Sequence, residues 1–201
     1  MEKAKKPLKI TAILTIILLL LSCNPIENET QSDSILVVLN LTGTDIEGNE
    51  VNFLQSDVVL VDSDTGFSSV AADAAKASFT AKLMDPTTTL TSSFYNNITI
   101  TRYIVAYVRS DGKNTEGVDV PYSFEGSLST LIEIDSTVDV SFIIVRDVAK
   151  LEPPLINLRE GRGEGTVEVT AKVDFYGHDM ANNKVKTTGY LTIFFANYID
   201  E

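Results

Sequence analysis

The sequence predicts an all-β domain, an antiparallel β-sandwich of about seven to nine strands. Apolar and polar residues alternate with a period of two over long stretches, and short segments containing Gly, Asp or Asn separate these stretches. No predicted helix is long enough to serve as the crossover of a βαβ unit, so a parallel sheet is not expected. A chain of 201 residues can bury one sizeable core, and one domain is the expectation.

The first 22 residues have the pattern of a signal peptide. Four lysines within the first nine residues precede an uncharged run from Ile10 to Ser22. This run is too short to cross a bilayer as a stable helix, which favours a signal peptide. The run ends in Leu-Leu-Ser-Cys at residues 20–23, and Cys23 is the only cysteine in the chain.

Residues 20–23 resemble the lipobox of bacterial lipoproteins. The resemblance implies that the thiol of Cys23 carries a diacylglycerol, that cleavage falls just before it, and that further acylation such as palmitate completes a membrane anchor. Asn24 favours the outer membrane, because an aspartate at that position retains lipoproteins of enteric bacteria at the inner membrane. The alternatives are an uncleaved membrane anchor and an ordinary signal peptide with a chance cysteine. A lone cysteine cannot form an intramolecular disulfide.

The expected division of the chain is a lipoprotein signal peptide over 1–22, a lipidated Cys23 with a flexible tether over 23–33, and a β-sandwich domain over 34–201. The tether is polar and too poor in apolar side chains to offset its ordering entropy. Removing the first 22 residues takes away four of the 16 basic and one of the 28 acidic residues. The remaining 12 basic and 27 acidic residues give a formal charge of about −15, which argues against nucleic-acid binding.

The first expected strands cover 35–41 and 58–61, two runs rich in β-branched residues that end at polar turns. Residues 68–77 are small and alanine-rich, and we expect a short helix or a loop there. A strand over 78–84 follows and ends at Asp85-Pro86.

The longest alternation covers residues 97–109. It sets Ile98, Ile100, Arg102, Ile104, Ala106 and Val108 against Thr99, Thr101, Tyr103, Val105 and Tyr107. One set is expected to face the core and the other to face outward.

Further along, 127–134 and 138–145 are expected to pair across a turn at 135–137. Pro153 and Pro154 exclude a central strand over 146–160, where a helical turn over 154–159 is expected instead. The segments 166–176 and 186–196 are expected to form a long closing hairpin.

Two segments, 43–51 and 177–185, share the pattern G-x-D-x-x-x-N-x-V. Asp and Asn at these offsets bond back to the backbone and tolerate left-handed conformations, so a turn is expected in each. Both segments resemble the D-x-x-G-N turn of bacterial immunoglobulin-like modules, although Asn182 stands where glycine is usual. Together with the strands, this favours an immunoglobulin-like sandwich, here without the disulfide and core tryptophan of antibody domains.

Few residues offer catalytic or metal chemistry. Asp62, Asp64 and Gly66 look like a truncated calcium loop, but the glycine and glutamate that such a loop needs are missing, so an ordinary turn is expected. The same holds for Asp111-Gly112-Lys113-Asn114, although sandwich-edge loops of this kind can gather carboxylates around one ion.

The sole histidine, His178, is expected in an exposed turn, and no G-x-S-x-G elbow supplies a nucleophile for it. The glycine-rich run 161–165 precedes a strand instead of following one, so it is expected to be a connector and not a phosphate loop. We predict no catalytic residue, no metal site and no cofactor, and Cys23 as the single lipid-attachment site.

Residues 107–112, 117–122 and 151–155 lie in a stretch from Tyr103 to Tyr198 that resembles a group of uncharacterised bacterial exported proteins. The resemblance implies a lipid-anchored β-sandwich and no known activity.

Three classes of function remain open from the sequence. The first is a structural or protein-interaction module of the cell envelope, anchored to the membrane by its lipid and engaging another envelope protein. The second is a calcium-dependent or carbohydrate-binding lipoprotein, and the third is a hydrolase. Because no nucleophile, base or metal constellation can be assembled, an enzyme is the least favoured of the three.

Overall fold

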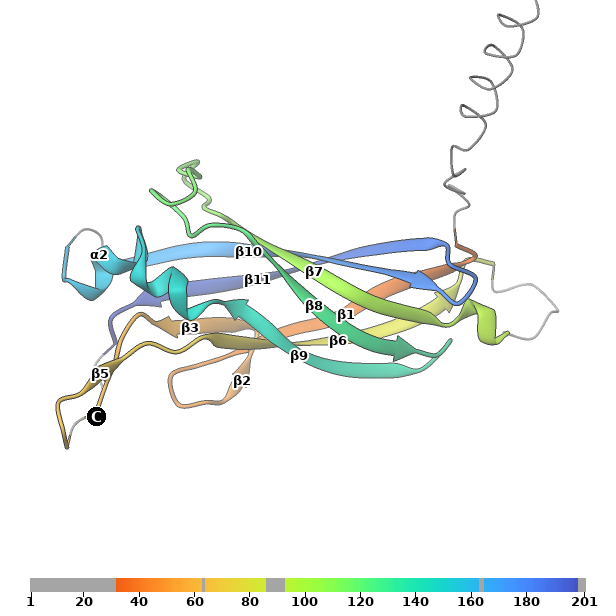
Figure 1. The fold of residues 1–201 in the computed structure, drawn as a ribbon, viewed down its shortest axis with the longest axis horizontal. Helices are drawn as coiled ribbons and strands as arrows, with labels where there is room; N and C mark the ends of the chain where they lie inside the picture. Colours follow the sequence, from red (N-terminus) through yellow and green to blue (C-terminus); the bar gives the residue numbers. More distant parts are fainter. Residues whose placement is uncertain (1–31, 63, 86–92, 163–164, 199–201) are drawn as a thin grey trace, which may run out of the picture.

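The long strands of the protein run side by side along the molecule (Figure 1), in a computed structural model that describes residues 32–62, 64–85, 93–162 and 165–198. The strands are β1 (Ser34–Thr44), β2 (Glu50–Val51), β3 (Phe53–Asp57), β4 (Leu60–Val61), β5 (Ser68–Ser69), β6 (Asp73–Leu83), β7 (Ile98–Val108), β8 (Phe124–Ile132), β9 (Thr137–Val145), β10 (Thr166–Asp179) and β11 (Lys184–Ala196). The short helices are η1 (Phe94–Asn96), η2 (Asp147–Leu151) and α2 (Leu155–Arg159). The predicted all-β class is confirmed.

Two sheets contain most of these strands. One has four strands in the order β2-β1-β6-β9, and the other has five in the order β3-β11-β10-β7-β8. All pairs between the named strands are antiparallel except β3 with β11, which is parallel. The expectation of a wholly antiparallel sandwich is therefore wrong at this edge. A parallel pair needs a long connection, and most of the domain lies between β3 and β11.

A cluster of four aromatic side chains fills the space between the two sheets. Phe79 of β6 and Phe142 of β9 come from the four-stranded sheet, and Tyr103 of β7 and Phe175 of β10 come from the five-stranded sheet. Ring centroids are 4.8 Å apart for Phe79 and Phe175, and 4.9 Å apart for Tyr103 and Phe142, in edge-to-face geometry. Such pairs add to the free energy of area burial, so this cluster joins the two sheets without a covalent link.

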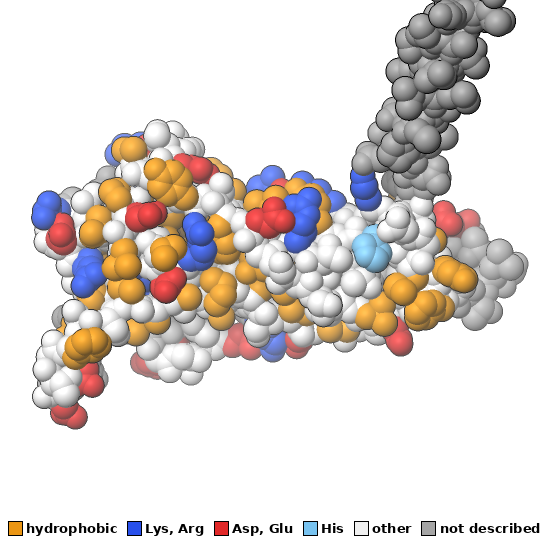
Figure 2. Space-filling model, in the orientation of Figure 1, with side chains coloured by type: hydrophobic (Ala, Val, Ile, Leu, Met, Phe, Trp, Pro, Cys, Tyr) orange, Lys and Arg blue, Asp and Glu red, His pale blue; other side chains and the backbone are white. Residues whose placement is uncertain are grey.

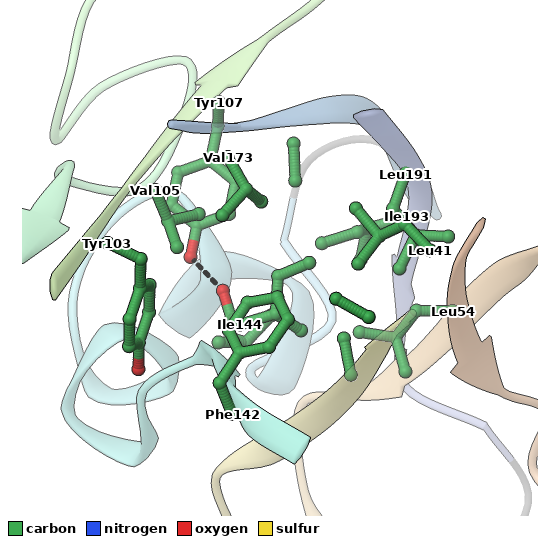
Figure 3. Packing of buried hydrophobic residues seen from close by; sticks show 14 of the residues in the cluster. Leu41, Leu54, Tyr103, Val105, Tyr107, Phe142, Ile144, Val173, Leu191 and Ile193 are labelled. Atoms are coloured by element: carbon green, nitrogen blue, oxygen red, sulfur yellow. Dashed lines mark hydrogen bonds between the residues drawn. The ribbon is translucent and has the colours of Figure 1, made fainter. Parts of the chain in front are cut away.

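A hydrogen bond crosses the core beside this cluster. The hydroxyl of Tyr107 donates to the backbone carbonyl of Ile144 over 2.7 Å (Figure 3). Burial raises the pKa of the Tyr107 hydroxyl, so the group stays a neutral donor.

The strand predicted over 97–109 is confirmed as β7, but its alternation is not continuous. The buried side chains are Ile98, Ile100, Tyr103, Val105 and Tyr107. The register of both neighbouring pairs shifts between Ile100 and Arg102. In the pairing with β8 the additional residue lies on β8, whereas in the pairing with β10 the two residues lie opposite the consecutive Gly177 and Tyr176. Thr101 is thus the extra residue of a β-bulge, which transfers the inward face from the first predicted set to the second.

The closing hairpin is confirmed as β10 and β11, whose register runs from Thr166 opposite Ala196 to His178 opposite Lys184. Its inward residues on β10 are those that the alternation predicts: Val167, Val169, Ala171, Val173 and Phe175. The helical turn expected after the prolines is confirmed as α2.

The expected pairing of β8 with β9 is wrong. β8 pairs with β7 in the five-stranded sheet, whereas β9 pairs with β6 in the four-stranded sheet. The turn between them therefore carries the chain from one sheet to the other. The local sequence does not distinguish a hairpin within one sheet from a connection between two sheets. In both arrangements the flanking strands alternate, and here the turn residue Asp135 has the positive φ that is also common in hairpin turns.

Two expectations for the region before β6 are also wrong. The alanine-rich segment 68–77 is mostly strand instead of helix or loop, because it contains β5 and the first five residues of β6. Ala75 and Ala77 belong to the core cluster and are 3 and 0% exposed. The strand expected over 58–61 is divided: β3 ends at Asp57, Val58 and Val59 are buried outside any strand, and only β4 remains.

Both G-x-D-x-x-x-N-x-V segments fold into turns, and the first closes the chain between β1 and β2. One carboxylate oxygen of Asp45 accepts the backbone N–H groups of Glu47 and Asn49 at 3.0 and 2.8 Å, and the other accepts the Asn49 side-chain amide at 2.9 Å. Gly48 has φ of 85° and donates its N–H to the Asp45 carbonyl. These bonds, led by that from Asn49, hold the pKa of Asp45 below its ordinary value.

The second segment repeats the same bonds between β10 and β11. Asp179 accepts from the backbone N–H groups of Ala181 and Asn183 at 2.9 and 2.8 Å, and from the Asn183 side chain at 2.8 Å. Asn182 takes the left-handed position with φ of 68°, as its place in the motif predicts.

The glycine that opens each motif marks a close backbone approach. A Cβ atom at Gly177 would collide with the Thr99 carbonyl oxygen, and one at Gly43 would lie 2.6 Å from the Phe53 carbonyl oxygen. Only glycine fits such positions without moving a neighbouring strand.

The two turns lie toward opposite ends of the molecule. We call the end that contains Ser32, η1 and the turn at 179–183 the tether pole, on the right in Figure 1. We call the end that contains the turn at 45–49 and the small β4–β5 sheet the groove pole, which lies toward the left. Ser32 and Asp33, expected in the tether, already belong to the domain, since Ser32 is buried and the Asp33 carbonyl accepts the Met84 N–H.

Candidate functional site

A groove of about 770 Å³ lies at the groove pole. The first turn supplies one wall, through residues 44–47, and the β4–β5 sheet with the following Ala71 supplies the other. The ends of β3 and β6 and one residue of η2 form the floor. The groove thus combines residues between 44 and 73 with two residues that are distant in sequence, Lys150 and Tyr198.

An ion pair lies at the floor of the groove. The Lys150 ammonium is 3.0 Å from the Asp73 carboxylate, and the Ser56 hydroxyl donates to the same carboxylate at 2.6 Å. The Lys150 side chain is only 1% exposed, and that of Asp73 is 18% exposed. Burial raises the pKa of Asp73, and the charge of Lys150 and the Ser56 hydroxyl oppose this effect only in part.

This pair fixes the shape of the floor. Removing one partner of a buried ion pair leaves an uncompensated charge, which costs about 3–5 kcal/mol. The pair also joins η2 to the start of β6, and Ser56 joins β3 to the same point. The carboxylate of Asp73 thus holds the Lys150 side chain in a fixed position.

The rim of the groove is acidic and apolar at once. Its carboxylates are those of Asp45, Glu47, Asp57 and Asp62, against the single Lys150 below them. Its apolar side chains are Ile46, Leu60, Val61 and Phe67, which are 57, 42, 40 and 69% exposed. Exposed apolar side chains gathered in one concavity are typical of an interaction site.

The residues that resembled a calcium loop form an ordinary tight turn beside this groove. Asp62 accepts the backbone N–H groups of Asp64 and Thr65 and the Thr65 hydroxyl, and Gly66 has φ of 67°. These bonds lower the pKa of the Asp62 carboxyl. Across the described ranges, no three His, Cys, Asp or Glu side chains are placed to hold a metal ion together.

The other candidate residues lie away from the groove. Asp111 is paired with Arg109 at 2.7 Å in a turn whose Gly112 has φ of 81°. His178 is at the tether pole, half-buried near the end of β10, with Nδ1 2.9 Å from the Asp179 carbonyl oxygen. The expectation of an exposed turn histidine is therefore wrong, because the turn begins one residue later, at Asp179.

Of the remaining expectations, the one for the glycine-rich run concerns described residues in part, and those for the N-terminal segment do not. Gly161, with φ of 67°, ends α2 together with Arg162, whose N–H donates to the Asn157 carbonyl, so the first part of the glycine-rich run is a helix cap. Cys23, Asn24 and the signal segment lie outside the described residues. Within the part that is described, no helix is long and apolar enough to cross a membrane.

The groove was not predicted from the sequence. Asp73 stood in a segment expected to be a helix or loop, and Lys150 in one expected to have no strand. The only signal was the local pattern: a lysine and an aspartate each flanked by small or apolar residues, in Asp-Ala-Ala at 73–75 and Val-Ala-Lys-Leu at 148–151.

No family model matches the chain, and no curated protein matches it.

Proposed function

We propose that the protein is a lipid-anchored lipoprotein of the bacterial cell envelope, held at the outer membrane, whose immunoglobulin-like β-sandwich binds another envelope protein through the groove. The observation that carries the proposal is the groove itself. It combines exposed apolar side chains and carboxylates, and it lies at the pole opposite the point where the chain enters the domain.

The strand order supports the immunoglobulin-like part of the proposal. In that architecture, strands A, B and E are neighbours in one sheet, and strands C, F and G are neighbours in the other. Here β1, β6 and β9 are neighbours in one sheet, and β7, β10 and β11 in the other, in the matching chain order. The pair Phe79–Phe175 joins the strands that correspond to B and F, where antibody domains have their disulfide.

The Leu-Leu-Ser-Cys sequence at 20–23 supports the lipid anchor. Replacing Cys23 by Ser is expected to abolish acylation and leave the precursor unprocessed by the lipoprotein signal peptidase. Labelling cells with a palmitate analogue, followed by a gel, measures both effects. A Cys23→Ser protein that is still processed at the same site and still labelled would contradict the anchor.

The chemistry of the groove defines the partner. Four rim carboxylates favour a partner segment that carries lysine or arginine, and the exposed Phe67, Leu60 and Ile46 favour apolar side chains in the same segment. The ion pair at the floor keeps this surface in one shape, which lowers the ordering cost of binding. We propose a binding role and not catalysis, since the one histidine lies at the opposite pole from the groove.

A site-specific photocrosslinker tests this role in native membranes. Placed at Phe67 it is expected to give one defined adduct, whereas at Tyr190 it is expected to give none. Tyr190 is a matched control because it is 62% exposed against 69% for Phe67 and lies on the outer face of β11. The charge reversal Glu47→Lys, at an exposed position, is expected to reduce the Phe67 adduct several-fold.

Two results would contradict the binding role. One is equal labelling from both positions, and the other is an adduct that Glu47→Lys leaves unchanged. A Phe67 adduct with polysaccharide instead of protein would support the carbohydrate-binding alternative.

A further inference from the structure

The tether pole carries exposed aromatic side chains that the fold does not need. Phe94 and Tyr95 are 60 and 66% exposed, and Met84 at the same end is 50% exposed. Figure 2 shows hydrophobic side chains gathered at this end of the molecule, at the lower right. Neither aromatic ring belongs to the core, and the two contact each other edge to face with centroids 6.4 Å apart.

The turn that presents these two rings is tightly held. Ser93 and Asn96 form a reciprocal cap, in which the Ser93 hydroxyl accepts the Tyr95 N–H and the Asn96 side chain accepts the Ser93 N–H. Asn97, which follows, is buried, and its side-chain oxygen accepts the Ile134 N–H at 3.2 Å. The rings are therefore displayed on a fixed support.

The same hydrogen-bond network reaches the first described residue of the chain. The Asn97 carbonyl accepts the Met180 N–H at 3.0 Å, from the second G-x-D-x-x-x-N-x-V turn. Asp179 of that turn hydrogen-bonds to Ser32, whose hydroxyl also accepts the Ser34 N–H at 3.0 Å. Phe94 and Tyr95 are thus fixed relative to the point where the tether enters the domain.

We propose that this pole lies on the bilayer, with Phe94 and Tyr95 in the interfacial layer of the lipid. The inference rests on the proposed acylation of Cys23. Nine residue steps separate Cys23 from Ser32, and a chain of that length spans at most about 30 Å when fully extended. Such a short link gives a high effective concentration of bilayer at this pole, so even a small aromatic contact is occupied.

The chemistry of the patch selects the lipid interface as its occupant. Tyrosine and tryptophan are enriched at membrane–water interfaces, and phenylalanine is common on the apolar face of helices that lie in this interface. The charges nearby are of both signs: Lys82 is paired with Asp135 at 2.7 Å, Lys184 follows the second turn, and the exposed Asp33 and Asp85 are acidic. The contact is therefore expected with neutral phosphatidylcholine and to be insensitive to salt.

The absence of tryptophan from the sequence provides the test. The mature chain from Cys23 onward is coupled through its only thiol to a maleimide lipid in phosphatidylcholine vesicles. Phe94→Trp then introduces a single reporter at the tether pole, and Phe67→Trp introduces one at the groove pole, at 69% exposure against 60%. Tyr190→Trp, on the side of the domain, is a second control.

The Phe94→Trp emission is expected to shift to shorter wavelength on coupling and to lose most of its intensity when the lipid chains are brominated. The two control reporters are expected to show neither effect. If Phe94→Trp remains as accessible to aqueous iodide as Phe67→Trp, or if all three reporters are quenched alike, the proposal is wrong. Chemical coupling makes this result independent of acylation in cells, which the Cys23→Ser experiment tests separately.

Discussion

The same nine-residue motif forms a turn toward each pole of the domain, yet the two turns have different surroundings. Asp45 and Asp179 each accept three hydrogen bonds from the equivalent positions of their own turn. Asp45 lines the groove, where its bonds are exposed, whereas Asp179 is 3% exposed and also bonds to Ser32. The motif therefore specifies a turn, and the packing around it decides whether the turn displays a surface or supports a structure.

Different interactions hold the structure together at the two poles. Near the tether pole, the second turn itself connects Ser32, β10, β11 and the residue after η1. At the groove pole, the first turn is exposed and its Ile46 N–H donates to the Gln55 side chain of β3 at 3.2 Å, while the ion pair between Lys150 and Asp73 holds the floor. Substitutions at the two poles should therefore change the stability by different amounts. The largest expected effect comes first.

Loss of the buried lysine should have the largest effect. Lys150→Met leaves the Asp73 carboxylate buried without its counter-charge, so we expect a loss of about 3–5 kcal/mol in the free energy of unfolding, measured by denaturant titration. The double variant with Asp73→Leu should recover much of this loss. Lys82→Met is the matched control: its pair with Asp135 is exposed, so a cost below about 1 kcal/mol is expected. A Lys150→Met protein as stable as the Lys82→Met protein would show that the floor does not depend on the pair.

A side chain at the first glycine of the second motif should come next. Gly177→Ala places a Cβ against the Thr99 carbonyl of β7, and moving a central strand should cost about 3 kcal/mol. Gly165→Ala, directly before the same hairpin, is the control, since a Cβ there would meet no atom within 4 Å. Melting temperatures measured for both variants compare the two sites. A Gly177→Ala protein that melts with or above the Gly165→Ala protein would contradict the close approach.

Replacing the equivalent aspartate of each turn compares the contributions of the two turns to stability directly. Asp179→Ala removes the acceptor of several donors, including partly buried backbone N–H groups, and should cost about 2 kcal/mol. Asp45→Ala removes the same bonds in an exposed turn, where water replaces them, so its effect on the melting temperature should be clearly smaller. Equal effects would mean that the surroundings of the turns do not matter.

Acid should weaken the second turn through the same aspartate. Burial acts to raise the pKa of Asp179, but hydrogen bonds from Asn183 and Ser32 outweigh it, so the folded-state pKa lies below the unfolded value of about 3.9. This group therefore contributes stability above the unfolded pKa and loses that contribution as the pH falls through the folded pKa. We expect the loss of melting temperature in this acid range to be shallower in Asp179→Asn than in the unchanged protein. A parallel pair of curves would contradict the linkage.

The smallest effect should come from exchanging the left-handed residues. Gly48 and Asn182 occupy equivalent positions with φ of 85° and 68°, and asparagine tolerates this region. Gly48→Asn should change the free energy of unfolding by only a few tenths of a kcal/mol, whereas Gly48→Val should lose roughly 1–2 kcal/mol. Two equally destabilised variants would show that the turns are not equivalent.

Much of the fold could be predicted because its signal is local. The closing hairpin, both G-x-D-x-x-x-N-x-V turns and the helical turn after the prolines each depend on residues close together in sequence. The wrong predictions concern features that depend on which distant strands pair with each other. Thr101 gives no sign of being a bulge, and the turn at Asp135 does not reveal that its flanking strands belong to different sheets. The alanines at the start of β6 suggested a short helix or a loop, whereas their place in the sheet depends on pairing with β1 and β9.

The groove could not be predicted from the sequence for the same reason. Lys150 and Asp73 are 77 positions apart, and nothing in either segment shows that they meet. Phe67 and Ile46 read as ordinary turn residues, because exposure of an apolar side chain depends on the fold around it. The turn chemistry of Asp45 and Asp62 was visible in the sequence, and these two residues form part of the rim.

The parallel edge has a consequence for the order in which the chain folds. β3 is near the start of the domain, but its partner β11 is at the end, with Phe53 opposite Thr192. Contacts between such distant residues form slowly, because a long loop must close before they stabilise anything. The five-stranded sheet therefore stays incomplete until the last strand has been synthesised.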